Sequence, residues 1–546
     1  MAVENRSEHV SLAEKFIRIC KQRKRGKKIA DSLGNELTGA GVLMRAMILR
    51  WLLARHVLDK DERVVGLLLP PTLAAVVANM ALTLDRRTVA NLNYTLSSDV
   101  NNSCLAQAGI RHVITSRAFM EKIQLELDAE LVYLEDFRAR ASWRDKLNGA
   151  LAAYAVPARL LSRCLGLHQV QGDDLNTVVF TSGSTGLPKG VMLTETNISS
   201  NVRAVQDAIM LRQEDVLLGI LPFFHSFGYT ATLWTVMTID VQGVYHFTPL
   251  DGKQIGKLCK KHGATVLLAT PTFLRTYLRR CDPDDFRSLD VVLVGAEKLP
   301  LELADAFEER FGVRPVEGYG TTELSPLVSV NIPASRALPG QAAAVREGTV
   351  GRPLPRIEAR VTDLETGRVL EPGQPGMLWV KGPNVMQGYW GREDLTAEVI
   401  QDGWYRTGDV ALIDHEGFIQ ITGRESRFSK IGGEMVPHLH VEDTLNRILS
   451  ELRPLPQDDE EPGGPMVAVT AVPDAKKGER LVVVHTELPQ SPQELCRALA
   501  RQGLPNLYIP SPDSFHQVPA LPVLGTGKLD LRALKQLAEE AFAPKT

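Results

Sequence analysis

Short runs of β-branched residues and leucine recur beside helical segments through the first 300 residues of the chain. Five such runs occupy residues 64–69, 111–116, 177–182, 264–269 and 290–295. Their length and composition are typical of buried strands, and their alternation with helices is typical of layers built on largely parallel sheets. The pattern therefore predicts an α/β fold.

The pattern changes after Gly348, where shorter strands are punctuated by glycine and proline. Residues 356–363, 376–382 and 417–423 have this character, which is typical of antiparallel structure. We expect a small β-barrel-like region over residues 348–424.

Beyond Arg424 the chain combines helical stretches with a solvated acidic loop and an apolar strand at 465–472. This mixture indicates a small α+β domain. The predicted organisation is a large N-terminal domain over residues 1–424, made of layered α/β subdomains and the β-rich region, followed by a small C-terminal domain over 425–546.

Two uncharged stretches, residues 64–84 and 216–239, are long enough to imitate membrane spans. Pro70 and Pro71 interrupt the first, and Pro222 and Gly228 interrupt the second, so neither forms one continuous helix. Both are interpreted as buried strand–turn–helix units.

Composition narrows the class of protein further. The 546 residues are 44% hydrophobic and 23% charged, with a formal net charge of −3, which excludes disorder and gives no electrostatic drive toward nucleic acid. The six cysteines are scattered without paired spacing, and the acidic start lacks the features of a secretory signal. These features indicate a reducing, cytoplasmic environment.

The strongest candidate for chemistry is TSGSTGLPKG, at residues 181–190, which follows an apolar strand. Its glycines let backbone N–H groups approach phosphate oxygens, its hydroxyls add donors, and Lys189 adds a point charge. The spacing does not match a Walker A loop. Read alone, the segment is either a phosphate cradle or a flexible Ser/Gly turn.

Three further motifs follow the Gly-rich loop in order: VEGYGTTELSP at 316–326, GWYRTGDVALIDHEGFIQITGR at 403–424 and LGTGKLD at 524–530. Together the four motifs resemble the adenylate-forming (ANL) family of acyl-CoA synthetases, luciferases and peptide-synthetase adenylation domains. Segments 92–98, 222–228, 294–300 and 428–436 look most similar to the acyl-ACP synthetase part of 2-acylglycerophosphoethanolamine acyltransferase/acyl-ACP synthetase.

The resemblance implies ATP-dependent activation of a carboxylate to an acyl-AMP, then attack by a thiol. It implies a Mg²⁺ cofactor held at Glu323, adenine stacking on Tyr319, ribose contacts from Asp409 and Arg424, and α-phosphate contact from Thr322. The full nucleotide set implied is Thr181, Ser182, Gly183, Ser184, Thr185, Gly186, Lys189, Gly295, Ala296, Glu297, Gly318, Tyr319, Gly320, Thr321, Asp409 and Arg424.

The resemblance also assigns residues to the acid and to catalysis. His225 lies where the family places a histidine beside the substrate carboxylate, and Lys528 matches the lysine that enters the site during adenylation. Aromatic residues around His225 are expected to line or gate an apolar tunnel for a medium- or long-chain fatty acid, with several of them serving only as core; they are Phe223, Phe224, Phe227, Tyr229 and Trp234.

The resemblance implies that the small C-terminal domain is mobile and rotates between the two half-reactions about a hinge at Ser426. The rotated domain brings Lys430 to the site, and Gly432 and Gly433 permit close passage of a pantetheine arm. The acceptor is CoA or the phosphopantetheine of a free acyl carrier protein. The resemblance leaves this choice open.

Two questions stay open at the level of sequence. Residues 141–168 interleave apolar and basic positions, which suits either peripheral contact with the inner membrane surface or an ordinary amphipathic helix pair. The chain as a whole is expected to be an acid–thiol ligase acting on a fatty acid, with acyl-ACP synthetase slightly ahead of acyl-CoA synthetase. The alternatives are a catalytically inert homologue that binds ligand or acts as a scaffold, and a ligase for another carboxylic acid in a specialised pathway.

Overall fold

The computed structural model describes residues 10–181, 188–337, 345–432, 434–452, 466–474, 477–523 and 529–542. Two compact units emerge from the contacts along the chain. The described residues up to 359 and those of 380–405 form unit 1, while those of 360–379 and from 406 onward form unit 2.

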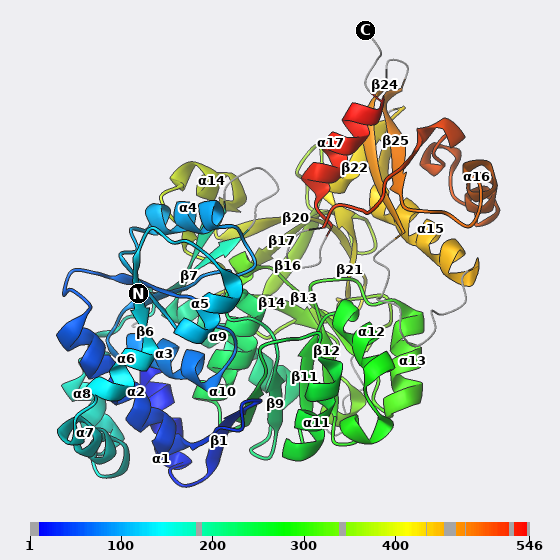
Figure 1. The fold of residues 1–546 in the computed structure, drawn as a ribbon. Helices are drawn as coiled ribbons and strands as arrows, with labels where there is room; N and C mark the ends of the chain where they lie inside the picture. Colours follow the sequence, from blue (N-terminus) through cyan, green and yellow to red (C-terminus); the bar gives the residue numbers. More distant parts are fainter. Residues whose placement is uncertain are drawn as a thin grey trace, which may run out of the picture. The chain divides into compact units, whose positions relative to one another are not determined.

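A seven-stranded sheet organises the first part of unit 1, in the order β18-β8-β7-β4-β3-β5-β6 (Figure 1). From β7 to β6 the neighbouring strands are parallel, and β8 and β18 extend the sheet with antiparallel pairing. The strands are β3 (Val64–Leu67), β4 (Thr88–Asn91), β5 (His112–Thr115), β6 (Glu130–Tyr133), β7 (Leu175–Thr181), β8 (Lys189–Thr194) and β18 (Gly388–Tyr389).

A nine-stranded sheet organises the second part, in the order β15-β14-β13-β12-β11-β9-β10-β1-β2. Its six central strands are parallel and its two ends are antiparallel. The strands are β1 (Lys27–Asp31), β2 (Glu36–Thr38), β9 (Val216–Gly219), β10 (Gln242–Tyr245), β11 (Val266–Ala269), β12 (Val291–Val294), β13 (Val316–Gly320), β14 (Leu327–Val330) and β15 (Arg352–Pro353).

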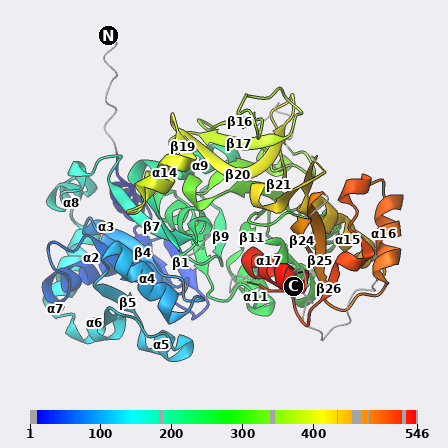
Figure 2. The same ribbon diagram turned by 90° about the horizontal axis from the view of Figure 1, so that it is seen from above.

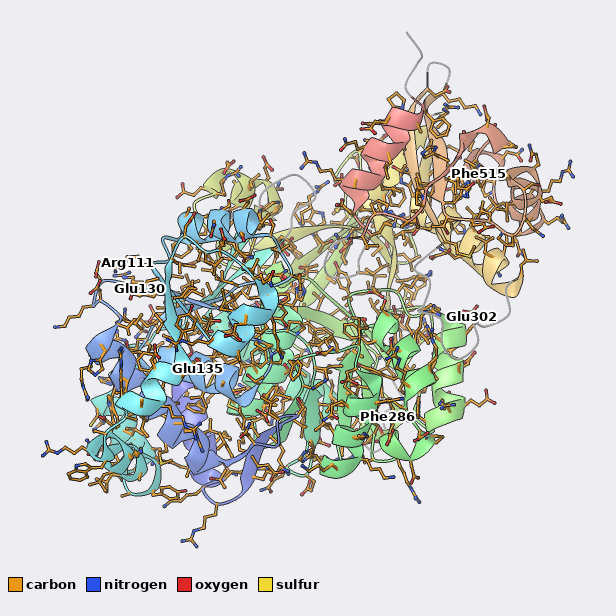
Figure 3. The ribbon with its side chains drawn as sticks, in the orientation of Figure 1. Arg111, Glu130, Glu135, Phe286, Glu302 and Phe515 are labelled. Carbon is orange, nitrogen blue, oxygen red and sulfur yellow. The ribbon has the colours of Figure 1, made fainter. Side chains whose placement is uncertain are left out.

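Helices pack on both sheets of unit 1 and enclose the core. A 3₁₀ turn, η3 (Pro283–Phe286), adds Phe286, which is labelled in Figure 3. Its ring centroid lies 5.0 Å from that of Phe311. The helices are α1 (Leu12–Gln22), α2 (Gly39–His56), α3 (Leu73–Leu84), α4 (Ser98–Ala108), α5 (Arg117–Ile123), α6 (Leu134–Arg140), α7 (Trp143–Tyr154), α8 (Ala158–Cys164), α9 (Glu195–Ile209), α10 (Thr235–Thr238), α11 (Gly252–His262), α12 (Pro271–Arg280), α13 (Leu301–Phe311) and α14 (Glu393–Val399).

The two uncharged stretches are strand–turn–helix units, as predicted. The first contains β3 and α3, and the second contains β9, a π-helix η2 (Phe227–Trp234) and α10. Nearly every residue of α3 is buried. Within the described ranges, no helix has both the length and the apolar character that a membrane span requires.

The β-rich region forms a five-stranded sheet, β16-β17-β20-β19, with β21 paired to β20. The division between the two units falls within β16, β17 and β20, so this region does not belong to one unit alone. The strands are β16 (Glu358–Thr362), β17 (Gly376–Lys381), β19 (Ile400–Gln401), β20 (Trp404–Ile413) and β21 (Ile419–Arg424).

The remainder of unit 2 is a sheet in the order β23-β22-β25-β24, with β26 beside β25, packed against three helices. Valine and leucine from both faces of β24 and β25 fill its cores. The elements are β22 (Phe428–Ile431), β23 (Glu434–Pro437), α15 (His438–Leu452), β24 (Val467–Asp474), β25 (Gly478–His485), α16 (Pro492–Arg501), β26 (Phe515–Gln517) and α17 (Leu531–Phe542).

The predicted fold class is confirmed: a large N-terminal α/β part is followed by a smaller C-terminal α+β part. The contacts group residues 406–424 with the C-terminal elements, whereas the sequence places a domain boundary at 424. A hinge at that boundary stays a prediction.

Candidate functional site

The Gly-rich segment connects two antiparallel strands. Thr181, the last residue of β7, is paired with Lys189, the first residue of β8, and both side chains are half-buried. Residues 182–187 lie outside the described ranges, so the predicted contacts of Ser182, Gly183, Ser184, Thr185 and Gly186 are not described. The Gly-rich segment therefore connects the two strands of a hairpin, whereas a Walker A loop leads from a strand into a helix.

Tyr389 links Lys189 to the carboxylate predicted to hold Mg²⁺. Its hydroxyl donates a hydrogen bond to Glu323 Oε1 at 2.9 Å, and Lys189 Nζ lies 4.8 Å from the centre of its ring. Burial, and next the nearby Glu323 carboxylate, raise the pKa of Tyr389, so the phenol stays protonated and donates. Tyr389 lies outside the motifs that predict the site, and its sequence neighbours give no signal of this role.

The backbone fixes this arrangement on both sides. Tyr389 pairs with Val191 of β8, and the adjacent Trp390 N–H donates to the carbonyl of Gly190 at 2.7 Å. On the other side, the Met386 N–H donates to the carbonyl of Glu323 at 2.8 Å. Residues 386–390 therefore connect the Gly-rich hairpin to the 316–326 motif within unit 1.

The 222–228 and 316–326 motifs meet through a hydroxyl pair. Ser226 Oγ donates to Thr322 Oγ1 across 3.1 Å, and Ser226 itself is buried. Tyr319, Thr322 and Glu323 are half-buried, so they remain partly open to solvent. The buried hydroxyl of Thr321 has no hydrogen-bond partner among the described residues.

Gly320 shapes the turn that carries these residues. A Cβ at this position would collide with the backbone carbonyl of Pro326, which cannot move aside as a flexible side chain can. The predicted adenine and phosphate residues therefore sit on a turn whose tight path requires glycine.

The segment after β12 lies beside the same motif. An added Cβ at Gly295 would lie 3.4 Å from the ring of Phe227 and 3.5 Å from the carbonyl of Gly318, so these three residues are neighbours. Ala296 adopts a φ of 71°, an uncommon conformation for a residue with a side chain and one that is concentrated at functional sites. Glu297 accepts a hydrogen bond from Thr272 Oγ1 at 2.8 Å.

The aromatic residues around His225 differ in burial. His225 and Phe227 are half-buried, whereas Phe223 and Phe224 are almost completely buried. Tyr229 and Trp234 are fully buried in the π-helix η2, and the Tyr229 hydroxyl donates to Asn176 Oδ1 at 3.0 Å. This matches the expectation that part of the set serves the core.

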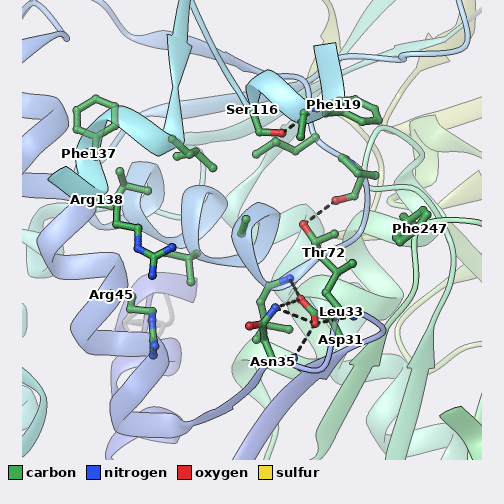
Figure 4. Close-up of a pocket in the computed structure, with 18 of the residues that line it drawn as sticks. Asp31, Leu33, Asn35, Arg45, Thr72, Ser116, Phe119, Phe137, Arg138 and Phe247 are labelled. Atoms are coloured by element: carbon green, nitrogen blue, oxygen red, sulfur yellow. Dashed lines mark hydrogen bonds between the residues drawn. The ribbon is translucent and has the colours of Figure 1, made fainter. Parts of the chain in front are cut away.

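An apolar cavity of about 860 Å³ lies between α2, α3, α5 and α6 of unit 1 (Figure 4). Tyr94 lines it, and the Tyr94 ring packs edge-on against Phe224, with centroids 4.8 Å apart. Phe224 in turn packs on His225, with centroids 4.6 Å apart. A series of ring contacts, from Tyr94 through Phe224, therefore connects the lining of the cavity to His225.

In unit 2, Asp409 and Arg424 face each other across β20 and β21. Arg424 Nε donates to Asp409 Oδ1 at 2.8 Å. Asp409 is buried and Arg424 is exposed, so the ion pair extends from the protein interior to the surface. This ion pair agrees with both the ribose-binding interpretation and a purely structural one.

The remaining predicted residues are spread along unit 2. Ser426 lies in a short 3₁₀ turn between β21 and β22, and Lys430 is exposed on β22, where its Nζ contacts Glu365 Oε1 at 3.0 Å. Gly432 is exposed in the following turn, with a φ of 59°. Gly433 and Lys528 lie outside the described residues.

The chain belongs to the AMP-binding enzyme family: the family described as "AMP-binding enzyme" matches residues 19–390. The predicted resemblance to adenylate-forming proteins is thereby confirmed. The acyl-ACP branch of that family stays a prediction.

Two curated relatives show the level of similarity. A long-chain-fatty-acid–CoA ligase of Bacillus subtilis is 32% identical over 371 residues, covering 66% of this chain and 61% of the relative. One of Escherichia coli O6:H1 is 30% identical over 372 residues, covering 67% and 62%. The matched region thus spans about three fifths of the length of these relatives.

Solved structures match over almost the whole chain. ATP-bound MatB from Rhodopseudomonas palustris has a TM-score of 0.79 at 25% identity, covering 97% of this chain and 99% of that one. The o-succinylbenzoate CoA synthetase MenE from Bacillus subtilis, in complex with its acyl-adenylate intermediate, has a TM-score of 0.78 at 25% identity, with coverages of 95% and 97%.

Proposed function

We propose that the protein is an ATP- and Mg²⁺-dependent ligase that converts a fatty acid to an acyl-AMP, releases pyrophosphate and transfers the acyl group to a thiol. The hydrogen bond between Ser226 and Thr322 carries the proposal, because it joins the predicted carboxylate-side motif to the predicted phosphate-side motif. Membership of the AMP-binding family and the acid–CoA ligases among the relatives support it.

In the proposed first step, a carboxylate oxygen attacks the α-phosphorus of ATP and pyrophosphate leaves. Negative charge grows on the α-phosphate oxygens, so donors held in place before the reaction lower the barrier. Thr322, Lys189 and Lys528 supply these donors in the proposal. Tyr319 stacks on adenine, and Asp409 with Arg424 binds the ribose.

Glu323 suits a Mg²⁺ ion that is shared with phosphates. No cluster of three or more His, Cys, Asp or Glu side chains that could hold a metal is found among the described residues. Mg²⁺ typically uses only one or two carboxylates where substrate phosphates and water complete its shell. The ion would neutralise phosphate charge, while Tyr389 keeps one oxygen of Glu323 oriented.

The apolar cavity supports a fatty acid as the substrate. The cavity lining is connected to His225 through the ring contacts of Tyr94 and Phe224, so an acid whose carboxylate lies at His225 would have an apolar space for its hydrocarbon chain nearby. Each buried methylene contributes about 0.8 kcal/mol, so medium and long chains are favoured over acetate.

CoA is the favoured acceptor, because the curated relatives described above are CoA ligases, and the phosphopantetheine of a free acyl carrier protein is the alternative. All six cysteines are free thiols, which supports a reaction in the reducing cytoplasm. Lys430, Gly432 and Gly433 form the acceptor path in the proposal, and Ser426 is the hinge.

The thiol-transfer half is tested with Ser426→Pro, which fixes φ near −65°. The expected result is retained acyl-AMP formation with impaired thioester formation, using CoA and acyl carrier protein in parallel. Equal losses in both half-reactions would argue against rotation about Ser426.

The adenylation half is tested by ATP–pyrophosphate exchange with acids from acetate to palmitate, together with benzoate, ferulate and amino acids. Lys528→Ala should lower exchange by about 10² to 10³, whereas Lys535→Ala, an exposed lysine of α17, should not. A best substrate among aromatic acids would move the assignment to a different acid. ATP binding without exchange for any acid would identify an inert homologue.

A further inference from the structure

Helix α7 exposes its large apolar side chains and buries its small ones. Trp143, Leu147, Leu151 and Tyr154 recur every three or four residues, and are 69%, 50%, 47% and 44% exposed. This spacing places them on one side of the helix.

The opposite side of α7 packs against the rest of unit 1. Its buried residues include Gly149, Ala152 and Ala153, and a Cβ at Gly149 would approach Ile48 of α2 to 2.8 Å. Small residues thus let α7 pack closely on α2. A helix at a protein surface ordinarily turns its large apolar residues toward the core, so the exposed stripe serves no purpose in this packing.

Basic side chains border the stripe. The Arg144 guanidinium lies 5.5 Å from the ring of Trp143, and Lys24 Nζ lies 5.6 Å from the ring of Tyr154. Lys146 is also exposed, and α8 continues the pattern with exposed Leu160. Arg159 and Arg163 of α8 are exposed as well.

Acidic residues are nearly absent from the segment that forms α7 and α8. Asp145 is the only acidic residue between 141 and 168. It is buried, accepts hydrogen bonds from Ser142 and pairs with Arg55. The exposed arginine and lysine side chains around the stripe, with no exposed carboxylate in residues 141–168, therefore favour an anionic partner.

We propose that α7 and the start of α8 form a docking face for an anionic lipid bilayer. Trp and Tyr at the two ends of the stripe have the amphipathic rings that favour the headgroup region, the leucines between them reach the acyl boundary, and the basic residues bind lipid phosphates. A second copy of the chain fits less well, because a twofold contact would bring like charges together.

The position of the face suits this role. Both views of unit 1 place α7 and α8 at its periphery, beside α1 and α2 (Figures 1 and 2). Lys21 Nζ donates to the carbonyl of Ala152 at 2.7 Å, which anchors α7 to α1. The face is thus a firmly attached part of unit 1, and the proposal does not depend on the proposed reaction.

The test is co-sedimentation of the full chain with vesicles of phosphatidylcholine alone and with added phosphatidylglycerol. Binding should require the anionic lipid and weaken with salt, because the surface attraction is screened. The double variant Leu147→Glu/Leu151→Glu should bind at least about tenfold more weakly. The matched control is Leu301→Glu, at an exposed leucine of α13, 48% exposed, which should bind as the parent does.

Circular dichroism and thermal melting of all three proteins verify that they are folded. The proposal would be overturned if the parent protein did not bind anionic vesicles. It would also be overturned if the double variant bound them as strongly as the parent. A face that instead mediates self-association would appear as a lipid-free dimer that Leu147→Glu/Leu151→Glu dissociates, and that result would also overturn it.

Discussion

The hydroxyl of Tyr389 donates to Glu323 Oε1 at 2.9 Å while the ring of Tyr389 faces Lys189 Nζ at 4.8 Å. One side chain thus joins a carboxylate and a cation that belong to different motifs. Because Tyr389 is buried and its phenol is protonated, it holds both groups near fixed positions before any ligand arrives.

Tyr389→Phe removes the hydrogen bond to Glu323 and keeps the ring beneath Lys189. We expect about a tenfold loss in exchange rate and a higher Mg²⁺ requirement, since a hydrogen bond to a charged group contributes about 1.5–3 kcal/mol. Tyr389→Leu also removes the cation–π contact and should lose more. The measurement is exchange activity against Mg²⁺ concentration, with Tyr133→Phe of β6 as control. An unchanged Mg²⁺ profile in Tyr389→Phe would show that the bond does not orient Glu323.

Gly320 and Gly295 should respond differently to alanine. Gly320→Ala forces a Cβ into the carbonyl of Pro326, so we expect a loss of several kcal/mol in the free energy of unfolding, or failure to fold. Gly295→Ala meets Phe227 and the Gly318 carbonyl only at ordinary contact distances, so its stability should stay near that of the parent.

The functional readout separates packing from nucleotide binding. If the backbone at Gly295 approaches ATP, Gly295→Ala should raise KM for ATP while its denaturation curve stays near that of the parent. Equal stability of the two variants would contradict the collision at Gly320.

His438 should make unit 2 sensitive to acid. Burial, and next the positive charge of Arg427, lower the pKa of His438 to about 3, from the ordinary histidine value of about 6.5. At pH values between about 3 and 6.5, His438 is protonated in the unfolded chain but stays neutral in the folded protein. Stability is therefore lost as pH falls from 6.5 toward 3, by up to about 1.4 kcal/mol per pH unit.

Hydrogen exchange of peptides from β24 and β25 measures this effect in the intact protein. His438→Gln should flatten the dependence on pH across that window. His440→Gln, at the exposed neighbour two residues on, should keep the dependence of the parent. Identical profiles in both variants would remove His438 as the cause.

Local hydrophobic patterns predict strands of the fold. They do not predict that the β-rich region is divided between the two compact units. The apolar runs at 64–69 and 290–295 became β3 and β12 because a buried parallel strand needs little beyond β-branched residues on both faces. The grouping of 360–379 with the C-terminal elements depends on contacts between distant residues, which no local pattern encodes.

The candidate site shows the same limit. Ordered motifs identified Thr322 and Glu323, but Tyr389 is 66 residues from Glu323 and was recognised only through its hydrogen bond. The outward leucines of α7 were ambiguous in sequence, since an amphipathic pattern does not say which face is buried. Gly149, packed against Ile48, identifies the buried face.

Under the proposed function, the size of the cavity should determine which acyl chain lengths are preferred. Ala74 of α3 lines the cavity and is exposed, so Ala74→Trp should fill part of the space without overpacking the core. A tail that enters the cavity would then lose several methylene contacts at about 0.8 kcal/mol each. We expect kcat/KM for palmitate to fall by about 10- to 100-fold relative to hexanoate, measured by pyrophosphate exchange. Ala334→Trp, at an exposed alanine outside the cavity, should leave the ratio unchanged. If Ala74→Trp lowers kcat/KM for palmitate and for hexanoate equally, and hexanoate is a substrate of the parent, the acyl tail does not enter this cavity. The proposed adenylation reaction would not be affected by that result.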